Sequence, residues 1–349
     1  HRLEAPQQML GRPLPAATHW ERVEPDADVG YRVYTHLRWV GAQQPLVYQD
    51  DTGARVVSLI KDNQSESASA RKAIYTSVLR CVGEQTICLF FTGRQHAGEN
   101  LDDLLALRDG ALAPMLWMSD ALAANTPKQH PERVVDLNCL VHARRQFVDI
   151  QDFFPSQCAR VITAIATVYH QEAQCTKAAL SPTQRLTAHQ THSAPVMDAL
   201  KGWMEQQFAD KQVEPNSRLG QAFNYMLKRW QALTGFLRIP GAPLDNNLAE
   251  QALKLSVRYR NNSLFYKNQH GAFVGDVLSS LIETCRLNAV NPIDYLSTLL
   301  DNRSAVFANP AEWLPWNCQD APTASAQAPP LGHFPPILGQ TGVFGVAVP

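Results

Sequence analysis

The amino-acid sequence predicts an α/β fold in which a mixed five-stranded sheet carries a large, all-helical insertion. Two observations predict it: short β-rich segments fill the first part of the chain, and apolar residues recur at helical spacing through residues 151–240. Hydrophobic residues make up 45% and charged residues 18% of the 349 residues, a globular composition that excludes a largely disordered chain. This length suits about two domains, or one domain with a large insertion.

The first strands are expected to form an antiparallel meander. In residues 46–60, two β-rich pieces flank Gly53 and predict a hairpin. A second hairpin is predicted from Ala73 to Val82 and from Thr86 to Thr92, on either side of a Gly83-Glu84 turn. Together these segments supply three antiparallel strands.

Two further strands follow. Leucines recur at helical spacing from Leu101 to Leu105, Met115 to Met118 predicts a fourth strand, and Val134 to Leu137 predicts a fifth. Residues Cys139 to Ile150 then predict a helix. The predicted order is three antiparallel strands, a helix, two more strands and a long helical segment. A ribonuclease-H-like fold with a helical insertion would produce this order.

The rest of the chain has the apolar spacing of helices. An amphipathic helix is predicted from Asn247 to Tyr259, with its apolar and polar residues on opposite faces. The other predicted helices are Ala159 to Gln174, Pro195 to Gln207, Leu219 to Leu237, Val277 to Leu287 and Pro292 to Leu300.

Charge and cysteine usage limit the function classes. The chain has 31 Lys+Arg and 32 Asp+Glu, so a uniformly basic nucleic-acid-binding protein is excluded and only local basic patches remain. Seven irregularly spaced cysteines without a Cys-x-x-Cys pair favour reduced thiols and a cytoplasmic location. The longest apolar runs are far shorter than the roughly 20 residues of a membrane helix, so no membrane partner is expected.

Two acidic residues follow apolar strand segments. Asp50 comes after Leu46-Val47-Tyr48, and Asp120 comes after the fourth strand. In a ribonuclease-H-like sheet the first and fourth strands are neighbours, so these carboxylates would lie close together and bind cations. Their hard oxygen ligands suit Mg²⁺. The alternative is structural: a turn at Asp51-Thr52-Gly53 and a helix cap at Asp120.

A third acidic residue lies at the start of the predicted helix from Asn247. If Asn247 is the N-cap, Glu250 sits three residues later and would close a capping-box-like arrangement. The functional alternative makes Glu250 a third metal ligand, beside Lys254 and Arg258 on the polar face, where a phosphodiester backbone could also bind.

Cys139 and His142 share one helical turn, and Arg144-Arg145 add positive charge beside them. Zinc at Cys139 and His142 would need two further ligands, and no second paired motif is found, so a buried Cys and a hydrogen-bonded His near the active site are preferred. Farther along, the stretch from Arg258 to Lys267 interleaves basic, amide and aromatic residues, which suits binding to a nucleic-acid backbone and stacking on bases.

Several separate blocks of this sequence occur in a familiar order. They are Asp50-Asp51-Thr52, the stretch from Asn138 to Phe147, the stretch from Pro243 to Glu250, Asn262 to Tyr266, Ser280 to Cys285 and Asn291 to Leu296. Over roughly residues 8 to 318, the chain resembles the DDE transposases of the bacterial insertion sequence 66 family.

The resemblance implies a mechanism and its site residues. Asp50, Asp120 and Glu250 would be the catalytic Asp-Asp-Glu triad and would hold two Mg²⁺ ions, which Mn²⁺ could replace. Asp50 rather than Asp51 matches the first acid. Cys139 with His142 matches a Cys-x-x-His signature, and Asp245-Asn246-Asn247 matches a block before the Glu. The implied partners are element-end and target DNA, a homo-oligomer on that DNA, and accessory proteins of the same element. The expected DNA-binding residues are Arg144, Arg145, Lys254, Arg258, Arg260 and Lys267.

The resemblance also implies a division of the chain. It predicts a remnant of an N-terminal DNA-binding or linker region (1–40), the first part of the core (41–150), the helical insertion (151–240), the Glu-bearing helix (241–277) and a C-terminal helical element (278–319). The Pro-rich composition of residues 320–349, and not the resemblance, predicts a flexible tail. Without an initiator Met at His1, we expect an N-terminally truncated or processed chain.

Two residues depart from the family pattern. Gln251 and Asn261 stand where an Arg and a Lys are usual, and each change removes a cation next to the expected DNA phosphates. The main alternative is therefore a catalytically silent, truncated transposase that acts as a DNA-binding or regulatory protein. A third candidate is a ribonuclease-H-like nuclease that has no connection with mobile DNA.

Overall fold

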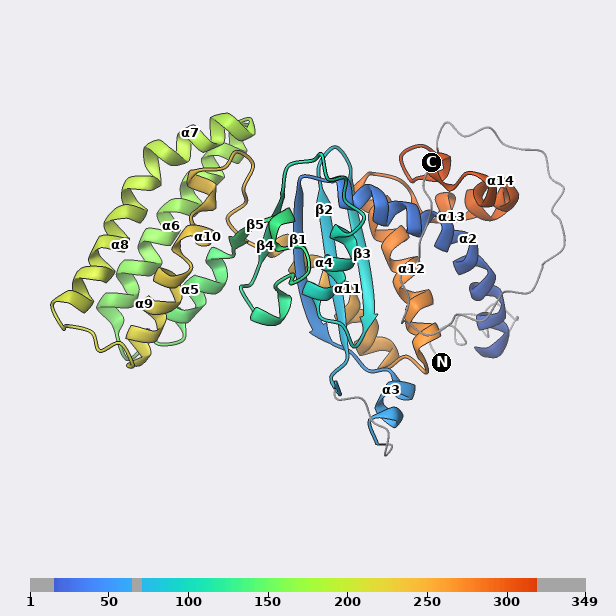
Figure 1. Ribbon diagram of the computed structural model, residues 1–349, viewed down its shortest axis with the longest axis horizontal. Coiled ribbons are helices and arrows are strands. Elements are labelled where there is room, and N and C mark those ends of the chain that lie inside the picture. The colour runs from blue at the N-terminus through green and yellow to red at the C-terminus, as the bar shows by residue number, and fades with distance from the viewer. Residues whose placement is uncertain (1–15, 65–70, 319–349) are drawn as a thin grey trace, which may run out of the picture.

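The computed structural model describes residues 16–64 and 71–318, which form a mixed sheet with helices on both faces (Figure 1). The sheet order is β3-β2-β1-β4-β5. Strand β1 pairs antiparallel with β2 and parallel with β4, so the predicted mixed five-stranded sheet is confirmed. The strands are β1 (Leu46–Gly53), β2 (Tyr75–Val82), β3 (Thr86–Gly93), β4 (Met115–Ser119) and β5 (Val134–Asn138).

The predicted hairpin at Gly53 is wrong. After β1 the chain forms the short helix α3 (Val57–Asp62), and the antiparallel partner of β1 is β2. Val57 N–H donates to the carbonyl of Tyr266 at 2.9 Å, and Val56 forms an isolated parallel bridge with the same residue. Contacts with a distant segment therefore override the strand propensity of residues 56–60, because β propensity depends strongly on tertiary context.

Helices α5 and α11 lie against one face of the sheet, and α6 to α10 form a helical segment that extends beyond the edge strand β5, on the left of Figure 1. It packs through one core that includes Phe223, Met204 and Ile165, together with Tyr48 of the sheet. The helices on this side are α5 (Leu140–Val148), α6 (Pro155–Lys177), α7 (Pro182–His192), α8 (Ala194–Ala209), α9 (Arg218–Lys228), α10 (Trp230–Leu233) and α11 (Asn247–Ser263).

The single helix predicted from Leu219 to Leu237 is broken into α9, α10 and a 3₁₀ turn at Gly235–Leu237. At this turn the backbone approaches β5 so closely that a Cβ on Gly235 would overlap the Leu137 side chain. Glycine allows that close approach, and the helical segment is thereby fastened to the edge of the sheet.

The other face of the sheet is covered by α2 and the C-terminal helices, on the right of Figure 1. Their core includes Val33, Leu37, Leu281 and Trp313. Two of the predicted domain boundaries fall inside helices: the boundary between residues 277 and 278 lies within α12, and the boundary after residue 40 lies within α2. Residues 1–15 and 319–349, in the first and last predicted parts of the chain, lie outside the described residues. The helices are α2 (Ala16–Gln43), α4 (Ala97–Leu105), α12 (Gln269–Leu287), α13 (Pro292–Asp301) and α14 (Arg303–Ala308).

Helix α12 covers the edge strand β3 with a row of polar side chains spaced four residues apart. Thr92, Phe90 and Cys88 donate their backbone N–H groups to Asp276, Ser280 and Thr284 at 2.6, 2.9 and 3.1 Å. Asn288 continues the row, since its Nδ2 donates to the Thr86 carbonyl at 2.7 Å. A four-residue helical step (~6 Å) nearly equals a two-residue strand step (~6.8 Å), so one helix satisfies a whole edge.

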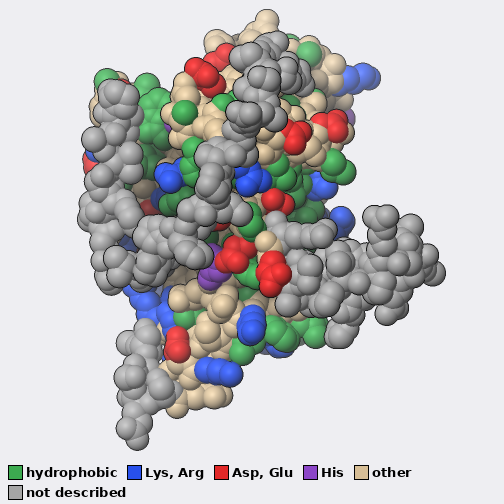
Figure 2. All heavy atoms as spheres, turned by 90° about the vertical axis from the view of Figure 1, so that its right-hand side faces the viewer, with side chains coloured by type: hydrophobic (Ala, Val, Ile, Leu, Met, Phe, Trp, Pro, Cys, Tyr) green, Lys and Arg blue, Asp and Glu red, His purple; other side chains and the backbone are tan. Residues whose placement is uncertain are grey.

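The distribution of charged side chains on the surface agrees with the near-neutral composition of the chain. On the face that carries α2 and α12 to α14, acidic and basic side chains are interspersed (Figure 2). No helix in residues 16–64 or 71–318 combines enough length with enough apolar character to cross a bilayer.

Candidate active site

Neighbouring acids on β1 face opposite sides of the sheet. Side chains alternate along a strand, so Asp50 shares a face with Tyr48, and Asp51 shares the other face with Val47. Tyr48 belongs to the core that α5 and α11 help to form, whereas Val47 belongs to the core beneath α2 and α4. Asp50 therefore faces the Glu250-bearing helix.

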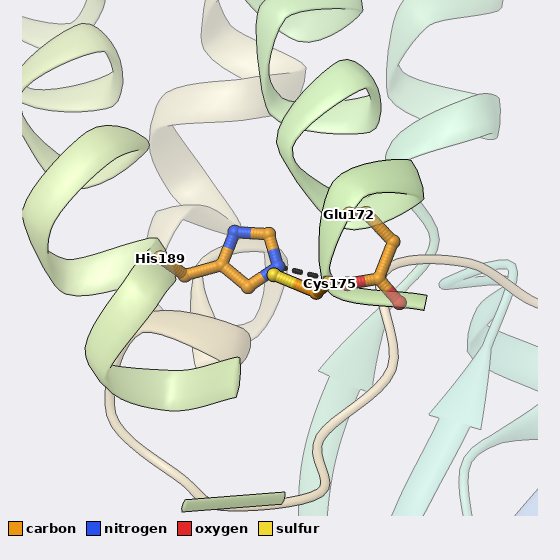
Figure 3. Close-up of side chains that lie close together, drawn as sticks. All are labelled: Glu172, Cys175 and His189. Atoms are coloured by element: carbon orange, nitrogen blue, oxygen red, sulfur yellow. Dashed lines mark hydrogen bonds and ion pairs between the residues drawn. The ribbon is translucent and has the colours of Figure 1, made fainter. Parts of the chain in front are cut away.

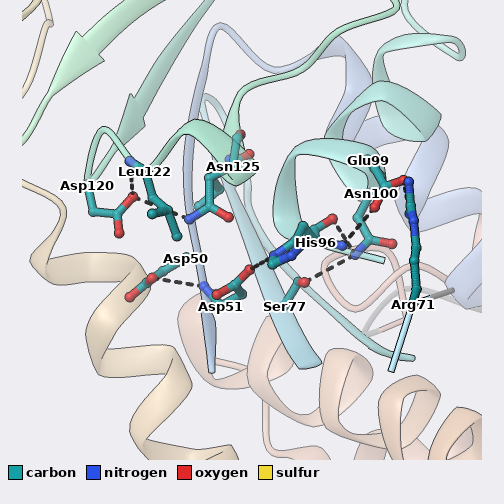
Figure 4. Close-up of polar contacts among 11 residues, drawn as sticks. Asp50, Asp51, Arg71, Ser77, His96, Glu99, Asn100, Asp120, Leu122 and Asn125 are labelled. Atoms are coloured by element: carbon teal, nitrogen blue, oxygen red, sulfur yellow. Dashed lines mark hydrogen bonds and ion pairs between the residues drawn. The ribbon is translucent and has the colours of Figure 1, made fainter. Parts of the chain in front are cut away.

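Asp51 is already engaged on its own side. Its Oδ2 lies 2.9 Å from Nδ1 of His96, and the His96 ring packs against the Tyr75 ring with centroids 4.0 Å apart and an interplanar angle of 36°. In Figure 4 the Asp50 carboxylate points away from His96, toward the side where Asp120 lies. This arrangement favours Asp50 over Asp51 as the first acid of the site.

Asp120 lies opposite Asp50. Tyr48 of β1 pairs with Met118 of β4, and two more residues along both parallel strands bring Asp50 and Asp120 level. Asp120 Oδ1 accepts hydrogen bonds from Leu122 N at 3.0 Å and from Asn125 Nδ2 at 3.2 Å. These bonds shape the loop after β4 and hold the carboxylate in place.

Glu250 does not cap its helix. Asn246, not Asn247, precedes α11, and its side chain makes no capping bond. Oε1 of Glu250 is buried and has no hydrogen-bond partner among the described residues, and Nε2 of His142 lies 3.8 Å from it. The capping-box interpretation is therefore wrong, and the Glu250 carboxylate remains available for a ligand.

The three carboxylates form one electrostatic site. The pKa of Asp50 is raised from 3.8 to about 7. Burial is the largest cause, the hydrogen bond from Asp51 N lowers the pKa, and the negative charges of Asp120, Asp51 and Glu250 add to the increase. The oxygens of Asp50, Asp120 and Glu250 do not all lie within 4.8 Å of one another. Hard oxygen donors, a buried acceptor without a donor and mutually repelling carboxylates together fit divalent cations such as Mg²⁺.

A buried polar network holds the site together. Nδ2 of Asn246 donates to the Gln49 carbonyl at 2.8 Å, and Nε2 of Gln49 donates to the Asn125 carbonyl. Asn125 in turn donates to Asp120, so the network joins α11, β1 and the loop after β4. Sequence reasoning missed Gln49 and Asn125. The available signal was a glutamine in an apolar strand directly before Asp50.

Cys139 and His142 connect α5 to this site. Cys139 Sγ accepts the Asn246 N–H at 3.3 Å, and burial raises the pKa of the thiol to about 11. Cys139 is buried as expected, but the expected hydrogen bond of His142 is not found, because its Nδ1 has no partner among the described residues and its Nε2 lies 3.8 Å from Glu250 Oε1.

The six expected DNA-binding cations lie on α5, on α11 and just after α11. Five are exposed, and Lys254 and Arg258 are one helical turn apart on α11. Arg260 differs, because it donates to the Gly53 carbonyl and so fastens the end of β1 to α11. The exposed cations are Arg144, Arg145, Lys254, Arg258 and Lys267.

The helical segment contacts the chain that leads into α11. Tyr169 donates its hydroxyl to Asp245 Oδ2 at 3.0 Å, while Asp245 Oδ1 accepts the Asn247 N–H at 3.1 Å. Arg185 of α7 donates to the Ala242 carbonyl at 3.0 Å. Helices α6 and α7 therefore fix the position from which Glu250 enters the site.

A second group of ligand-type side chains lies inside the helical segment. Glu172, Cys175 and His189 point toward one another (Figure 3), with one ligand atom of each within 4.8 Å of the others. Glu172 Oε2 lies 2.8 Å from His189 Nε2 and 2.8 Å from Arg185 Nε, and Ser193 lies 2.9 Å from His189 Nδ1. Arg185 already supplies the positive charge here, so this group is an ion-pair network that joins α6 to α7.

Known proteins are similar to this chain over part of its length. The family model described as "Transposase IS66 family" matches residues 1–273. Three proteins of Sinorhizobium fredii (strain NBRC 101917 / NGR234), each described as uncharacterized, are similar to the chain. They are y4jD (32% identical over 183 residues; 51% of the chain, 35% of the relative), y4hP (30% over 204; 54% and 36%) and y4qI (31% over 183; 51% and 33%). The matched segment thus spans about a third of each relative. No solved structure matches.

Proposed function

Because the chain belongs to the IS66 family of transposases, we propose that Asp50, Asp120 and Glu250 form the catalytic site of a DDE transposase. Its reaction in DNA transposition would be cleavage of a phosphodiester bond at the element end, followed by joining of the freed 3′-hydroxyl to target DNA. The buried Oε1 of Glu250, which accepts no hydrogen bond from the described residues, carries this proposal, because a glutamate with only a structural role would use that oxygen in a hydrogen bond.

The proposed fold is ribonuclease-H-like, with residues 151–240 as an insertion before the Glu-bearing helix. The order β3-β2-β1-β4-β5 supports it, as does the parallel pairing of β1 with β4 that brings Asp50 and Asp120 level. In this arrangement the first two acids come from strand ends and the third from a helix. Carboxylates from separate elements then converge on one edge of the sheet.

Two Mg²⁺ ions, or Mn²⁺ in their place, would be held by Asp50, Asp120 and Glu250. Such a pair activates an attacking oxygen and stabilises the leaving oxygen in phosphoryl transfer. The protein's own contribution is positioning. Asp50 would bind the ions as a carboxylate, the Gln49 network holds Asp120, and His142 lies beside Glu250.

DNA is the proposed partner, bound by exposed cations near the site. Lys254 and Arg258 continue the helix face of Glu250 at four-residue steps, so a phosphate backbone could follow α11 away from the acids. Arg144 and Arg145 extend the positive surface on α5. A homo-oligomer on DNA and a cytoplasmic location belong to the same proposal.

Substitution of the acids tests the proposal. In Asp50→Asn and Glu250→Gln variants, Mg²⁺-dependent cleavage and strand transfer should fall by more than about 100-fold, since even an outer-shell partner of a metal ligand costs roughly 10–100-fold. The matched control is Asp51→Asn, because Asp51 pairs with His96 on the opposite face and should lose far less. Thermal unfolding would check that all three variants fold.

Two results would contradict the assignment. Strand transfer at the wild-type rate by Asp50→Asn or Glu250→Gln would remove these residues from the catalytic site. A wild-type protein that binds DNA and cleaves none under any Mg²⁺ or Mn²⁺ condition would instead favour the silent, regulatory alternative.

A further inference from the structure

Helix α11 ends in a turn that exposes two large apolar side chains. Leu264 is 60% exposed and Phe265 is 54% exposed. Leu264 has a φ of 61°, a left-handed conformation that is rare for a branched residue. The turn is closed by hydrogen bonds from Leu264 N to Arg260 O and from Phe265 N to Ser263 O, both 2.7 Å. An unusual backbone thus presents apolar groups to solvent.

The residue after this pair is firmly anchored. Tyr266 N donates to the Arg55 carbonyl at 2.9 Å, and Val57 N donates to the Tyr266 carbonyl at 2.9 Å. The Tyr266 ring packs so closely on Gly275 that a Cβ there would lie 3.0 Å from it. With α11 on one side and this anchor on the other, Leu264 and Phe265 are held at a defined point of the surface.

The surroundings of the pair are basic. From Gln251 to Gly275 the chain has no Asp or Glu, whereas Lys254, Arg258 and Lys267 are exposed. A polyanion complements this charge, and an apolar pair flanked by cations is the composition that nucleic-acid-binding surfaces use to unstack or stack on bases.

The same helix links this turn to the acids. Fourteen residues separate Glu250 from Leu264, which is ~21 Å along α11 at 1.5 Å per residue. At ~3.4 Å per base pair along a strand, this corresponds to about six base pairs of DNA. Lys254 and Arg258 lie on the Glu250 side of the helix between the two points.

We propose that Leu264 and Phe265 form an apolar wedge that enters a base step of the bound DNA, about six base pairs from the phosphodiester at the acids. This inference rests on the proposed function for the identity of the partner. Insertion of apolar side chains between base pairs unstacks them and kinks the duplex. The wedge would thereby fix how far the duplex extends from the cleaved bond before it is distorted.

The test uses the full chain, Ca²⁺ in place of Mg²⁺ and duplexes with a 3′-hydroxyl end. 2-Aminopurine, whose fluorescence rises on unstacking, is placed at each position in turn. Wild-type protein should give a fluorescence maximum about six positions from the end. The Leu264→Ala/Phe265→Ala double variant should abolish the maximum and weaken binding by about 10- to 100-fold, as loss of a base-stacking contact does. Phe265→Trp should retain the maximum.

The control is Ile293→Ala, which removes a 75% exposed apolar side chain on α13 and should change neither quantity. An unaltered maximum in the double variant would overturn the wedge. A change in oligomeric state of the double variant without a change in fluorescence would also overturn it and would assign the pair to an interface between two copies of the chain. Asp50→Asn should keep the maximum while it loses cleavage, so failure of the wedge and failure of the catalytic assignment are distinguishable.

Discussion

Asp276 shows how a single buried acid can set the pH response of the fold. It is 5% exposed, and its carboxyl group accepts hydrogen bonds from Thr92 N at 2.6 Å and Thr92 Oγ1 at 2.7 Å. Burial raises its pKa from 3.8 to about 7, and these hydrogen bonds only partly oppose the increase. The folded protein therefore holds this proton more tightly than the unfolded chain does.

We expect Asp276→Asn to flatten the decline of stability with rising pH. The contribution of Asp276 is fully present below about pH 4 and is lost as the pH rises through about 7, because only the folded chain keeps the proton in that window. Urea unfolding at several pH values would measure the free energy of unfolding of the wild type and the variant. Asp294→Asn, on the surface of α13, is the control, and an equal slope in all three proteins would refute the prediction.

Among the secondary-structure elements, α12 covers the sheet edge formed by β3. Ser280 is buried, accepts the Phe90 N–H at 2.9 Å and donates to the Asp276 carbonyl at 2.7 Å. An edge strand presents a row of unpaired N–H groups that favours pairing with other chains. The side chains of α12 accept hydrogen bonds from these N–H groups, so the groups are paired within the same chain.

Ser280→Ala should destabilise the protein by about 1–3 kcal/mol, because the Phe90 N–H stays buried without an acceptor. The neighbouring Ser279→Ala is the matched control, since Ser279 is only partly buried and should have a much smaller effect. Chemical denaturation of both variants measures the difference. Equal losses of stability would show that α12 does not act through this hydrogen bond.

At the scale of the whole molecule, the helical segment and the sheet meet at the chain that leads into α11. Tyr169 and Arg185 donate hydrogen bonds to Asp245 and to the Ala242 carbonyl, just before Glu250 enters the site. Outer partners that orient a ligand usually matter for the metal that it binds. The helical segment can therefore influence the acids without contributing a ligand.

We predict that Tyr169→Phe raises the Mg²⁺ concentration needed for half-maximal cleavage by about 10-fold or more, with much of the rate restored at high Mg²⁺. Tyr31→Phe, an exposed tyrosine on α2, should leave this concentration unchanged. A Mg²⁺ titration of the cleavage rate makes the comparison. A Tyr169→Phe variant with a lower maximal rate and a wild-type Mg²⁺ requirement would exclude the positioning role.

The residues of the candidate site could be proposed from the sequence, but their surroundings could not. Asp50 and Asp120 follow strand segments and Glu250 lies on a polar helix face, but this pattern left a turn, a helix cap and a capping box open, and the family resemblance selected the three acids. The pairing of Asp51 with His96 could not be read from the pattern, because it depends on which helix covers which face of the sheet. The error at the Asn247 cap has a similar cause, since the buried network at Asn246 decides where α11 begins.

The sequence by itself determined the five strands and the long helical stretch, because hydrophobic periodicity and turn residues are local properties of the chain. Tertiary structure alone decided that residues 57–62 form a helix, that α12 covers β3, and that Oε1 of Glu250 is buried and accepts no hydrogen bond from the described residues. Each of these depends on contacts between residues far apart in sequence. Burial and the satisfaction of backbone hydrogen bonds are properties of the packed molecule, so they cannot be predicted from the local sequence pattern.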